Sequence, residues 1–339
     1  MRAAVFTAFG GGDAVEIQER PDLEPGAGEA VIDVHAASLN RHDLWILQGN
    51  SAMVSAEALP FVSGLDAAGV VSAVGEGADG LAEGDRVLLC PNETCGICRY
   101  CREGPEMLCE QFSLYHGAFA EQALVDAHRL LPLPADVSYT DAAALPTAYV
   151  TAWRMLQTAG VGPGDLVFVP GATGGVGVAA VQLSSVLAAE TIGTSTSERK
   201  LDRLEAVGCD HTIRSDDPDE LVDAVGSIGS PDAVMNHLGG EFTQAGLEML
   251  RRGGTMVICG RTAGDRSAFD VAPFFLQHHR IVGSTMGTQN DLATLADLVA
   301  DGAFEPLVGE TYALEETGAA FDDMLERDAF GKLVVEPSE

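Results

Sequence analysis

Short, partly alternating apolar runs occupy the first 128 residues. Runs such as Ala30–Val34, Ala68–Val74 and Arg86–Leu89 are separated by glycine, proline, aspartate and asparagine. Short segments of this composition between turn residues are typical of half-buried strands. The pattern predicts a β-rich, partly closed module at the start of the chain.

The periodicity changes from about residue 135. Asp141–Gln157 has helical spacing, and strands and helices then alternate as far as about residue 276. The expected strands are Leu166–Pro170, Thr191–Thr194, His211–Ile213, Ala233–Asn236 and Thr255–Cys259. The expected helices between them are Val176–Ala189, Glu198–Val207, Pro218–Ser227 and Glu241–Leu250. This alternation predicts an α/β fold with a doubly wound parallel sheet.

The remaining segment predicts a return to the first module. A strand at Arg280–Ser284 and a helix at Asp291–Asp301 are followed by a final strand at Lys332–Val335. We therefore expect one domain from residues 1–147 and 277–339, and an inserted domain from residues 148–276. No run of about 18 apolar residues is present, and the N-terminus lacks a basic segment before an apolar core. We expect a cytoplasmic protein without a membrane span.

The charge balance narrows the possible partners. The chain has 51 acidic and 19 basic residues, a net charge of -32, and lysine only at Lys200 and Lys332. A binder of duplex nucleic acid needs a basic surface, so that class is excluded. Repulsion among so many acids is screened within about 3 Å at 1 M salt. We hypothesise a protein adapted to a salt-rich cytoplasm.

Four of the seven cysteines lie within fifteen residues. Cys95, Cys98, Cys101 and Cys109 can surround one tetrahedral ion, and four thiolates leave no open position for water. The expected occupant is one structural zinc ion, and a disulfide or redox role is the alternative. Use of cysteine in this way also suits a reducing cytoplasm.

A glycine-rich loop follows the first strand of the predicted parallel sheet. The candidate cofactor-binding residues in it are Gly171, Ala172, Thr173, Gly174, Gly175, Val176 and Gly177. Between a strand and a helix, such a loop brings backbone N–H groups to a dinucleotide pyrophosphate. We expect tight turning at Gly171, close pyrophosphate approach at Gly174 and close helix packing at Gly177. A glycine-rich turn without a ligand is the alternative.

The end of the next strand predicts which dinucleotide binds. An NAD site places an acid there for the ribose hydroxyl, whereas this chain has Thr194 and Ser195, followed by Lys200. Hydroxyl groups and cations suit a 2′-phosphate, so NADP(H) is the expected cofactor. Lys200 as a solvated cation at a helix start is the alternative.

At this point the whole chain resembles the medium-chain dehydrogenases, the superfamily of zinc-containing alcohol dehydrogenases and quinone oxidoreductases. The resemblance rests on the cysteine lobe and on GDRV, LPTAYVTAW, GATGGVG, GGTMVICG and IVGSTMG, which begin at residues 84, 145, 171, 253 and 281. It implies a GroES-like β-rich catalytic domain joined to a Rossmann domain, and pairing of two copies through the strand at 280–284. A homodimer is therefore expected.

Departures from the family pattern bear on its catalytic metal. Metal-dependent members place a cysteine at the position of Asn40, a histidine at that of Leu65, and a cysteine or acid at that of Thr147. Leu65 cannot ligate metal, and neutral oxygen atoms are weak zinc ligands. Asp66, which follows Leu65, is expected to be a polar packing residue; a metal site of Asp66 with His42 and His116 is an alternative.

The resemblance then favours hydride transfer without a catalytic metal. The expected substrate is a quinone or an α,β-unsaturated carbonyl, with Asn40 and His42 as the candidate catalytic hydrogen-bond donors. Capping of a turn by Asn40 and a surface position for His42 are the structural alternatives. Two other functions stay open: an NADP-linked alcohol dehydrogenase or aldehyde reductase, and an NADPH-binding protein with little turnover.

Overall fold

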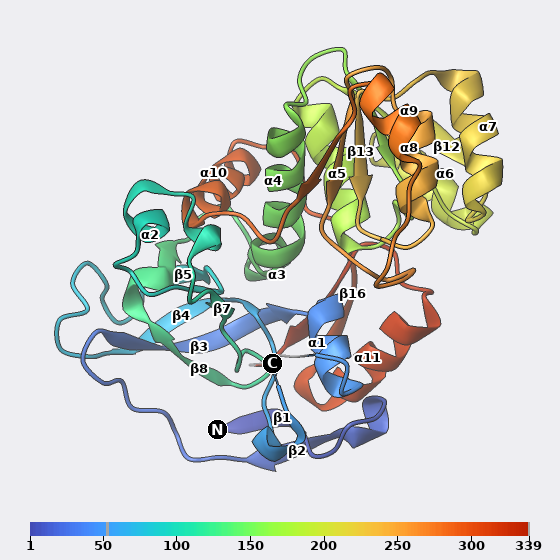
Figure 1. Ribbon diagram of the computed structural model, residues 1–339. Coiled ribbons are helices and arrows are strands. Elements are labelled where there is room, and N and C mark those ends of the chain that lie inside the picture. The colour runs from blue at the N-terminus through green and yellow to red at the C-terminus, as the bar shows by residue number, and fades with distance from the viewer. Residues whose placement is uncertain (52–53, 338–339) are drawn as a thin grey trace. The chain divides into compact units, whose positions relative to one another are not determined.

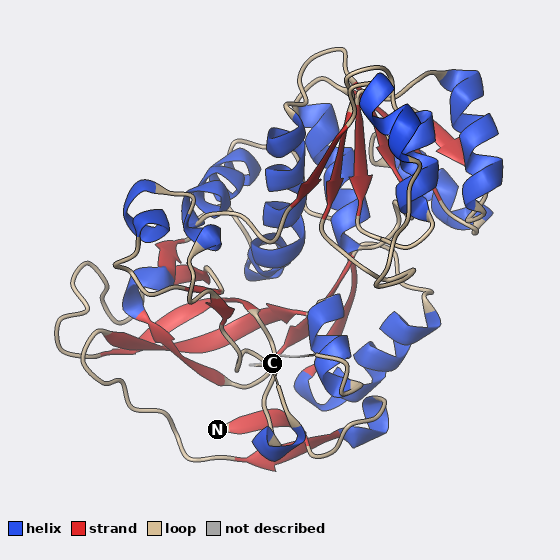
Figure 2. Cartoon of the chain, viewed as in Figure 1, coloured by secondary structure: helices blue, strands red, loops and turns tan. Residues whose placement is uncertain are grey.

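The computed structural model describes residues 1–51 and 54–337, which form two compact units. Unit 1 comprises residues 1–147 and 288–339, and unit 2 comprises residues 148–287. The β-rich part and the parallel sheet confirm the predicted fold class (Figure 1, Figure 2). No helix in the described part of the chain is long and apolar enough to cross a bilayer.

Unit 1 is built around a largely antiparallel seven-stranded sheet. Its strand order is β16-β17-β3-β4-β5-β9, and β8 pairs with β3. The bounds are β3 Glu29–Ser38, β4 Asp66–Val74, β5 Arg86–Leu89, β8 Gln122–Asp126, β9 Leu130–Pro132, β16 Val308–Ala313 and β17 Lys332–Glu336. Because β17 pairs with β3 and β3 with β4, the start of β17 lies near the end of β3 and the start of β4.

The smaller elements of unit 1 surround this sheet. Two short ribbons are formed by β1 Arg2–Phe6 with β2 Val15–Glu19, and by β6 Asn92–Glu93 with β7 Ser113–Leu114. The helices are α1 Arg41–Leu47, α2 Arg99–Glu103, α3 Tyr139–Ala144, α10 Gln289–Ala300 and α11 Thr317–Glu326. An apolar core includes Phe6, Ile32, Phe119 and Phe321, all with no more than 1% of their surface exposed.

Unit 2 contains a six-stranded parallel sheet in the order β12-β11-β10-β13-β14-β15. Its strands are β10 Leu166–Val169, β11 Glu190–Thr194, β12 His211–Ile213, β13 Ala233–Asn236, β14 Thr255–Ile258 and β15 Arg280–Gly283. Its helices are α4 Val150–Ala159, α5 Gly175–Val186, α6 Glu198–Ala206, α7 Pro218–Ile228, α8 Phe242–Met249 and α9 Val271–Leu276. The reversal of strand order beside β10 is the arrangement that binds dinucleotides.

Two predictions need correction. The inserted domain was expected to end at residue 276, but unit 2 extends to residue 287. The reason is that β15 joins the parallel sheet of unit 2, where it pairs with β14. The single helix expected over 141–157 is divided into α3 and α4 by a π-helical turn, Leu145–Tyr149. Pro146 lies in this turn, and proline lacks the N–H that a continuous α-helix requires.

Candidate functional site

The glycine loop of unit 2 is shaped by its contact with the end of β11. Gly171 adopts a left-handed conformation with φ of 61°, which glycine tolerates best. Its N–H donates to Thr194 Oγ1 at 2.9 Å, and the Ala172 N–H donates to the Thr194 carbonyl at 2.9 Å. Thr194 therefore fixes the path of the loop by both its side chain and its backbone.

The rest of the loop forms the start of α5. No atom lies within 4 Å of the position that a Gly174 Cβ would occupy, so this face is open to a ligand. A Cβ on Gly177 would lie 2.7 Å from Ala172 Cα, and only glycine allows that approach. Thr173 leads into the N-cap at Gly174, and Gly175 and Val176 open the helix. Its first N–H groups lack helical partners and suit a phosphate.

Hydroxyl and cationic side chains lie at the carboxyl end of β11. Thr194, Ser195 and Lys200 are buried, so Lys200 is not the solvated cation of the alternative interpretation. Sequence reasoning missed Arg214, which follows β12. Because β12 pairs with β11, Arg214 lies beside Ser195, and its Nε donates to the Thr196 carbonyl at 3.2 Å. Only the strand order reveals this neighbour.

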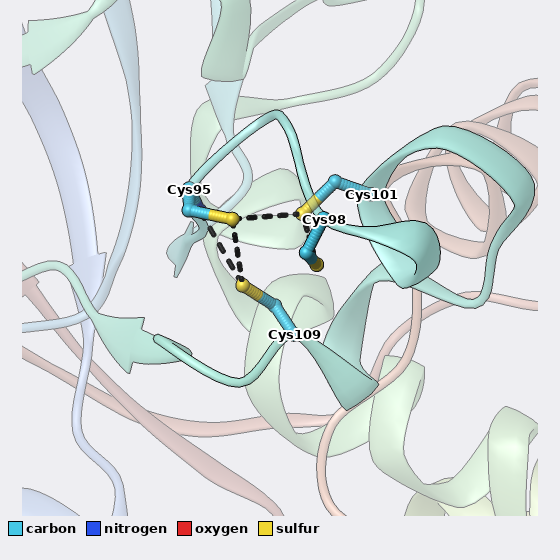
Figure 3. Close-up of side chains that lie close together, drawn as sticks. All are labelled: Cys95, Cys98, Cys101 and Cys109. Carbon is cyan, nitrogen blue, oxygen red and sulfur yellow. Dashed lines mark hydrogen bonds between the residues drawn. The ribbon is translucent and has the colours of Figure 1, made fainter.

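The four cysteines of the predicted zinc lobe converge in unit 1 (Figure 3). Sγ–Sγ distances are 3.4 Å for Cys98–Cys101, 3.6 Å for Cys95–Cys109 and 3.9 Å for Cys95–Cys101. Zn–S bonds of about 2.3 Å in a tetrahedron require sulfur atoms about 3.8 Å apart. The Cys95 and Gln111 N–H groups also point at Cys109 Sγ, each at 3.4 Å. The cluster fits one tetrahedral zinc ion.

A buried arginine anchors this lobe to the rest of unit 1. Arg129 has 5% of its surface exposed, and its Nη1 lies 2.8 Å from Glu106 Oε2. Glu106 lies between Cys101 and Cys109 in the sequence. The same guanidinium donates to Thr94, next to Cys95. The lobe is thus held at both ends, which suits a structural role.

A second cluster of unit 1 surrounds the carboxylate of Asp66. Ser38 Oγ and Asn40 Nδ2 donate to Asp66 Oδ2 at 2.8 and 2.9 Å. Thr147 Oγ1 donates to Asp66 Oδ1 at 2.5 Å, and Lys332 Nζ lies 3.4 Å from Oδ2. We refer to Ser38, Asn40, Asp66, Thr147 and Lys332 as the Asp66 cluster.

Sequence reasoning missed two members of this cluster, Ser38 and Lys332, and Lys332 is the charged one. Its Nζ donates to Asn40 Oδ1 at 2.6 Å and to the Leu39 carbonyl at 2.8 Å, and the residue has 3% of its surface exposed. Burial lowers the pKa of Lys332, while the nearby carboxylates of Asp66 and Asp43 act in the opposite direction. The cluster therefore contains a buried ion pair between β17 and β4.

Asp43 connects this cluster to the preceding loop. It accepts hydrogen bonds from the Asn40 N–H at 3.0 Å, from Ser63 Oγ at 2.6 Å and from the Gly64 N–H at 3.0 Å. The bond to Asn40 is half of the capping box of α1. Burial raises the pKa of Asp43 to about 7. Asp43 thereby positions Asn40 relative to the segment that carries Leu65 and Asp66.

Asn40, Leu65 and Thr147 are the three positions that the resemblance aligns with catalytic zinc ligands. Leu65 is fully buried and offers no ligand atom. The Asn40 amide donates to Asp66 and to the Ser38 carbonyl, and its oxygen accepts from Lys332. Thr147 is bonded to Asp66. Because Lys332 brings a positive charge to these donors, the residues do not fit a catalytic zinc ion.

His42 lies on α1 and stacks against His116. Their ring centroids are 5.6 Å apart with planes 20° apart, and the edge of Phe61 packs against His116. In the described structure, His42 Nε2 and His116 Nδ1 lack hydrogen-bond partners. Burial lowers the pKa of His42, and burial together with His42 lowers that of His116 to about 4. At neutral pH both rings are uncharged, and each keeps one N–H donor.

This pair predicts a loss of stability in acid. The unfolded chain binds protons at histidine below about pH 6.5, whereas the buried His116 ring resists protonation until about pH 4. The free energy of unfolding should therefore fall as the pH drops from about 6.5 to 4. His116→Phe keeps an aromatic ring against His42 and should reduce this slope in denaturant titrations at constant KCl. An unchanged slope would show that His116 is not the group responsible.

Two further polar residues, Tyr149 and Arg41, lie in buried or half-buried positions. The Tyr149 hydroxyl donates to Gln182 Oε1 at 2.5 Å inside unit 2, and Tyr149 has 1% of its surface exposed. Arg41 is half-buried on α1, where burial and the nearby Arg327 lower its pKa. Tyr149 therefore belongs to the core of unit 2.

Comparison with known proteins agrees with this architecture. Family models match at residues 26–135, the alcohol dehydrogenase GroES-like domain, and at residues 175–301, the zinc-binding dehydrogenase family. An alcohol dehydrogenase from Moraxella sp. is 32% identical over 99% of each chain. This chain belongs to the medium-chain dehydrogenase/reductase superfamily. It is an oxidoreductase of that superfamily.

Members with different names are similar to it. An acryloyl-coenzyme A reductase from Metallosphaera sedula is 30% identical, over 94% of this chain and 96% of the relative. The crystal structure of an NAD-dependent alcohol dehydrogenase is 35% identical, with a TM-score of 0.90 and full coverage of both chains. Members that resemble this chain thus include both alcohol dehydrogenases and an acryloyl-coenzyme A reductase.

Proposed function

We propose that the protein is an NADPH-dependent reductase of quinones or α,β-unsaturated carbonyl compounds that works without a catalytic metal. The observation that carries this proposal is the Asp66 cluster. Asn40 and Thr147 direct their side chains to Asp66, Leu65 is apolar, and Lys332 places an ammonium group where metal-dependent members gather ligands. The reaction must therefore proceed with ordinary hydrogen-bond donors.

A conjugated acceptor suits such donors. Bound NADPH would supply a hydride. When the hydride reaches a conjugated carbon, negative charge moves to the acceptor oxygen, where neutral donors can stabilise it. Because its pKa is lowered, the His42 ring is uncharged at neutral pH and offers a neutral N–H donor. The predicted donor role of Asn40 becomes indirect in this proposal, since its two N–H groups point at Asp66 and Ser38.

The preference for NADP(H) is supported by the surroundings of β11. Thr194 and Ser195 occupy the positions where an NAD site carries an acid. Lys200 follows them closely in the sequence, and Arg214 lies beside them because β12 pairs with β11. The glycine loop, residues 171–177, would hold the pyrophosphate at the start of α5. We propose Ser195, Lys200 and Arg214 as the groups around the 2′-phosphate.

Arg214→Ala should weaken NADPH binding selectively. A hydrogen bond to a charged group contributes about 1.5–3 kcal/mol, so the Kd for NADPH should rise about 10- to 100-fold. The Kd for NADH should stay the same, because NADH lacks the 2′-phosphate. Fluorescence titration with both nucleotides measures the change, and Arg203→Ala in the last turn of α6 is the matched control. An equal loss for both nucleotides would contradict the role of Arg214.

The proposed reaction is tested with a panel of acceptors in concentrated KCl. NADPH oxidation is expected with quinones, enals or enones, at higher kcat/KM than with simple aldehydes or ketones. A preference for aldehydes or alcohols would support an NADP-linked alcohol dehydrogenase; two relatives are named alcohol dehydrogenases, one of them NAD-dependent. Stoichiometric NADPH binding without turnover of any acceptor would instead support a nucleotide-binding protein.

We also propose a homodimer formed through β15. This strand ends the parallel sheet of unit 2 and has only β14 as a paired neighbour in the described structure. The adjacent α9 exposes Val271, Phe275 and Leu276, each with more than half of its surface accessible. An edge strand beside exposed apolar side chains is suited to pairing with a second copy. Light scattering in KCl should give twice the mass of one chain.

A further inference from the structure

Thr147 is where the Asp66 cluster reaches the protein surface. Ser38, Asn40, Asp66 and Lys332 have 0–6% of their surface exposed, whereas Thr147 is only partly buried. The π-helical turn that interrupts the predicted helix at Pro146 carries Thr147. A small molecule can therefore contact Thr147 while the carboxylate behind it stays out of water.

The direction of the hydrogen bond determines what Thr147 can do. Its hydroxyl hydrogen points at Asp66 Oδ1, 2.5 Å away, so the outward side of Thr147 Oγ1 presents lone pairs. A hydroxyl in this arrangement can accept a proton from a substrate O–H while passing its own proton to the carboxylate. The same two transfers in reverse deliver a proton to a substrate oxygen.

We propose that Thr147 and Asp66 form the proton relay of this oxidoreductase, with Thr147 in contact with the substrate oxygen. The proposal rests on the function proposed above. It assigns roles to two residues that the sequence indicated only as a lost metal position and a packing residue. Asn40, Ser38 and Lys332 position Asp66, because each places a donor against its Oδ2.

The relay balances for both directions of reaction. In reduction, hydride addition to carbon moves an electron pair to the substrate oxygen, which takes the hydroxyl proton of Thr147. Thr147 then takes the proton of the Asp66 carboxyl group, which becomes a carboxylate. A conjugated ketone leaves as its enol and rearranges in water to the saturated ketone. In oxidation, the alcohol proton moves to Thr147 and the Thr147 proton moves to Asp66 as hydride leaves carbon.

Lys332 compensates the negative charge of Asp66 inside the cluster. Its ammonium nitrogen lies 3.4 Å from Asp66 Oδ2, and both residues are buried.

Thr147→Val tests the relay because it keeps the shape of threonine and removes the hydroxyl. With the acceptor that the wild-type protein turns over best, kcat should fall about 100-fold or more, the usual contribution of acid–base catalysis. The solvent deuterium isotope effect on kcat should change as well, while NADPH binding in unit 2 should not. Thr147→Ser retains the hydroxyl and should recover most of the activity.

Thr140→Val is the matched control. Thr140 is also partly buried and donates to a carboxylate, Glu336 Oε1 at 2.9 Å, outside the Asp66 cluster. Its variant should keep the wild-type kcat and isotope effect. If Thr147→Val keeps kcat within twofold and the same isotope effect, the relay is wrong although the proposed function stands. If the wild-type protein turns over no carbonyl or alcohol, both are wrong.

Discussion

In dilute buffer the protein should unfold at a much lower temperature than in molar KCl. The net charge is -32, and at 0.1 M salt charges interact over about 10 Å, compared with about 3 Å at 1 M. Both lysines are buried, so arginine supplies the side-chain cations at the surface. Acidic side chains in excess therefore repel one another across the folded surface, and the repulsion is strongest at low salt.

The expected rise in Tm between 0.1 and 2 M KCl is about 10 °C or more. Each kcal/mol of stability moves Tm by about 2–4 °C in domains of this size, so this rise corresponds to several kcal/mol. Calorimetry or circular dichroism in a KCl series measures it. NaCl at equal ionic strength separates screening from specific ion binding. Highest stability in dilute buffer would contradict adaptation to a salt-rich cytoplasm.

Asp66→Ala should be among the most destabilising single substitutions in unit 1. It leaves the ammonium group of Lys332 buried with its closest carboxylate removed, and breaking a buried pair in this way costs about 3–5 kcal/mol. It also removes the acceptor for Ser38, Asn40 and Thr147. Denaturant titration at constant KCl should report the loss as a lower unfolding midpoint.

The double variant Asp66→Asn with Lys332→Met is the matched comparison. It removes both charges and keeps side chains of similar size, so it should be more stable than Asp66→Ala alone. The ordering of the two variants distinguishes an uncompensated charge from a simple loss of packing. A loss below about 1 kcal/mol for Asp66→Ala would mean that the pair does not organise this part of the fold.

Features that depend on neighbours along the chain could be predicted from the sequence. The cysteine lobe needs only the spacing of Cys95 to Cys109, and the glycine loop needs only a strand before and a helix after it. The parallel sheet followed from the alternation of apolar strands and helices. In these cases the local pattern and the three-dimensional contact involve the same short segment.

Two residues that sequence reasoning did not find, Lys332 and Arg214, lie far in the sequence from the residues they contact. Lys332 is 266 residues from Asp66, and the two meet because β17 pairs with β3 and β3 with β4. Arg214 meets Ser195 because β12 pairs with β11. No spacing rule connects such residues, and their roles become visible only when the strand order is known. The scarcity of lysine was a usable signal, because the chain has lysine only at Lys200 and Lys332. It was used for Lys200 alone, although it pointed equally to Lys332.

Local chemistry also changed one predicted element. Helical periodicity continued from Asp141 to Gln157, but it cannot register the missing N–H of Pro146. Thr147 lies in the resulting π-helical turn and donates to Asp66 Oδ1. The break in the predicted helix therefore falls in the segment that carries Thr147.

Metal content of the active protein tests the central claim most directly. The protein is purified in KCl, dialysed against EDTA and then against metal-free buffer, and assayed for activity and for zinc by mass spectrometry. We predict one zinc ion per chain, lost in Cys109→Ser, and NADPH-dependent activity that does not increase when zinc is added back. Two zinc ions per chain, with activity that disappears as the second is removed, would contradict a reaction that proceeds without a catalytic metal.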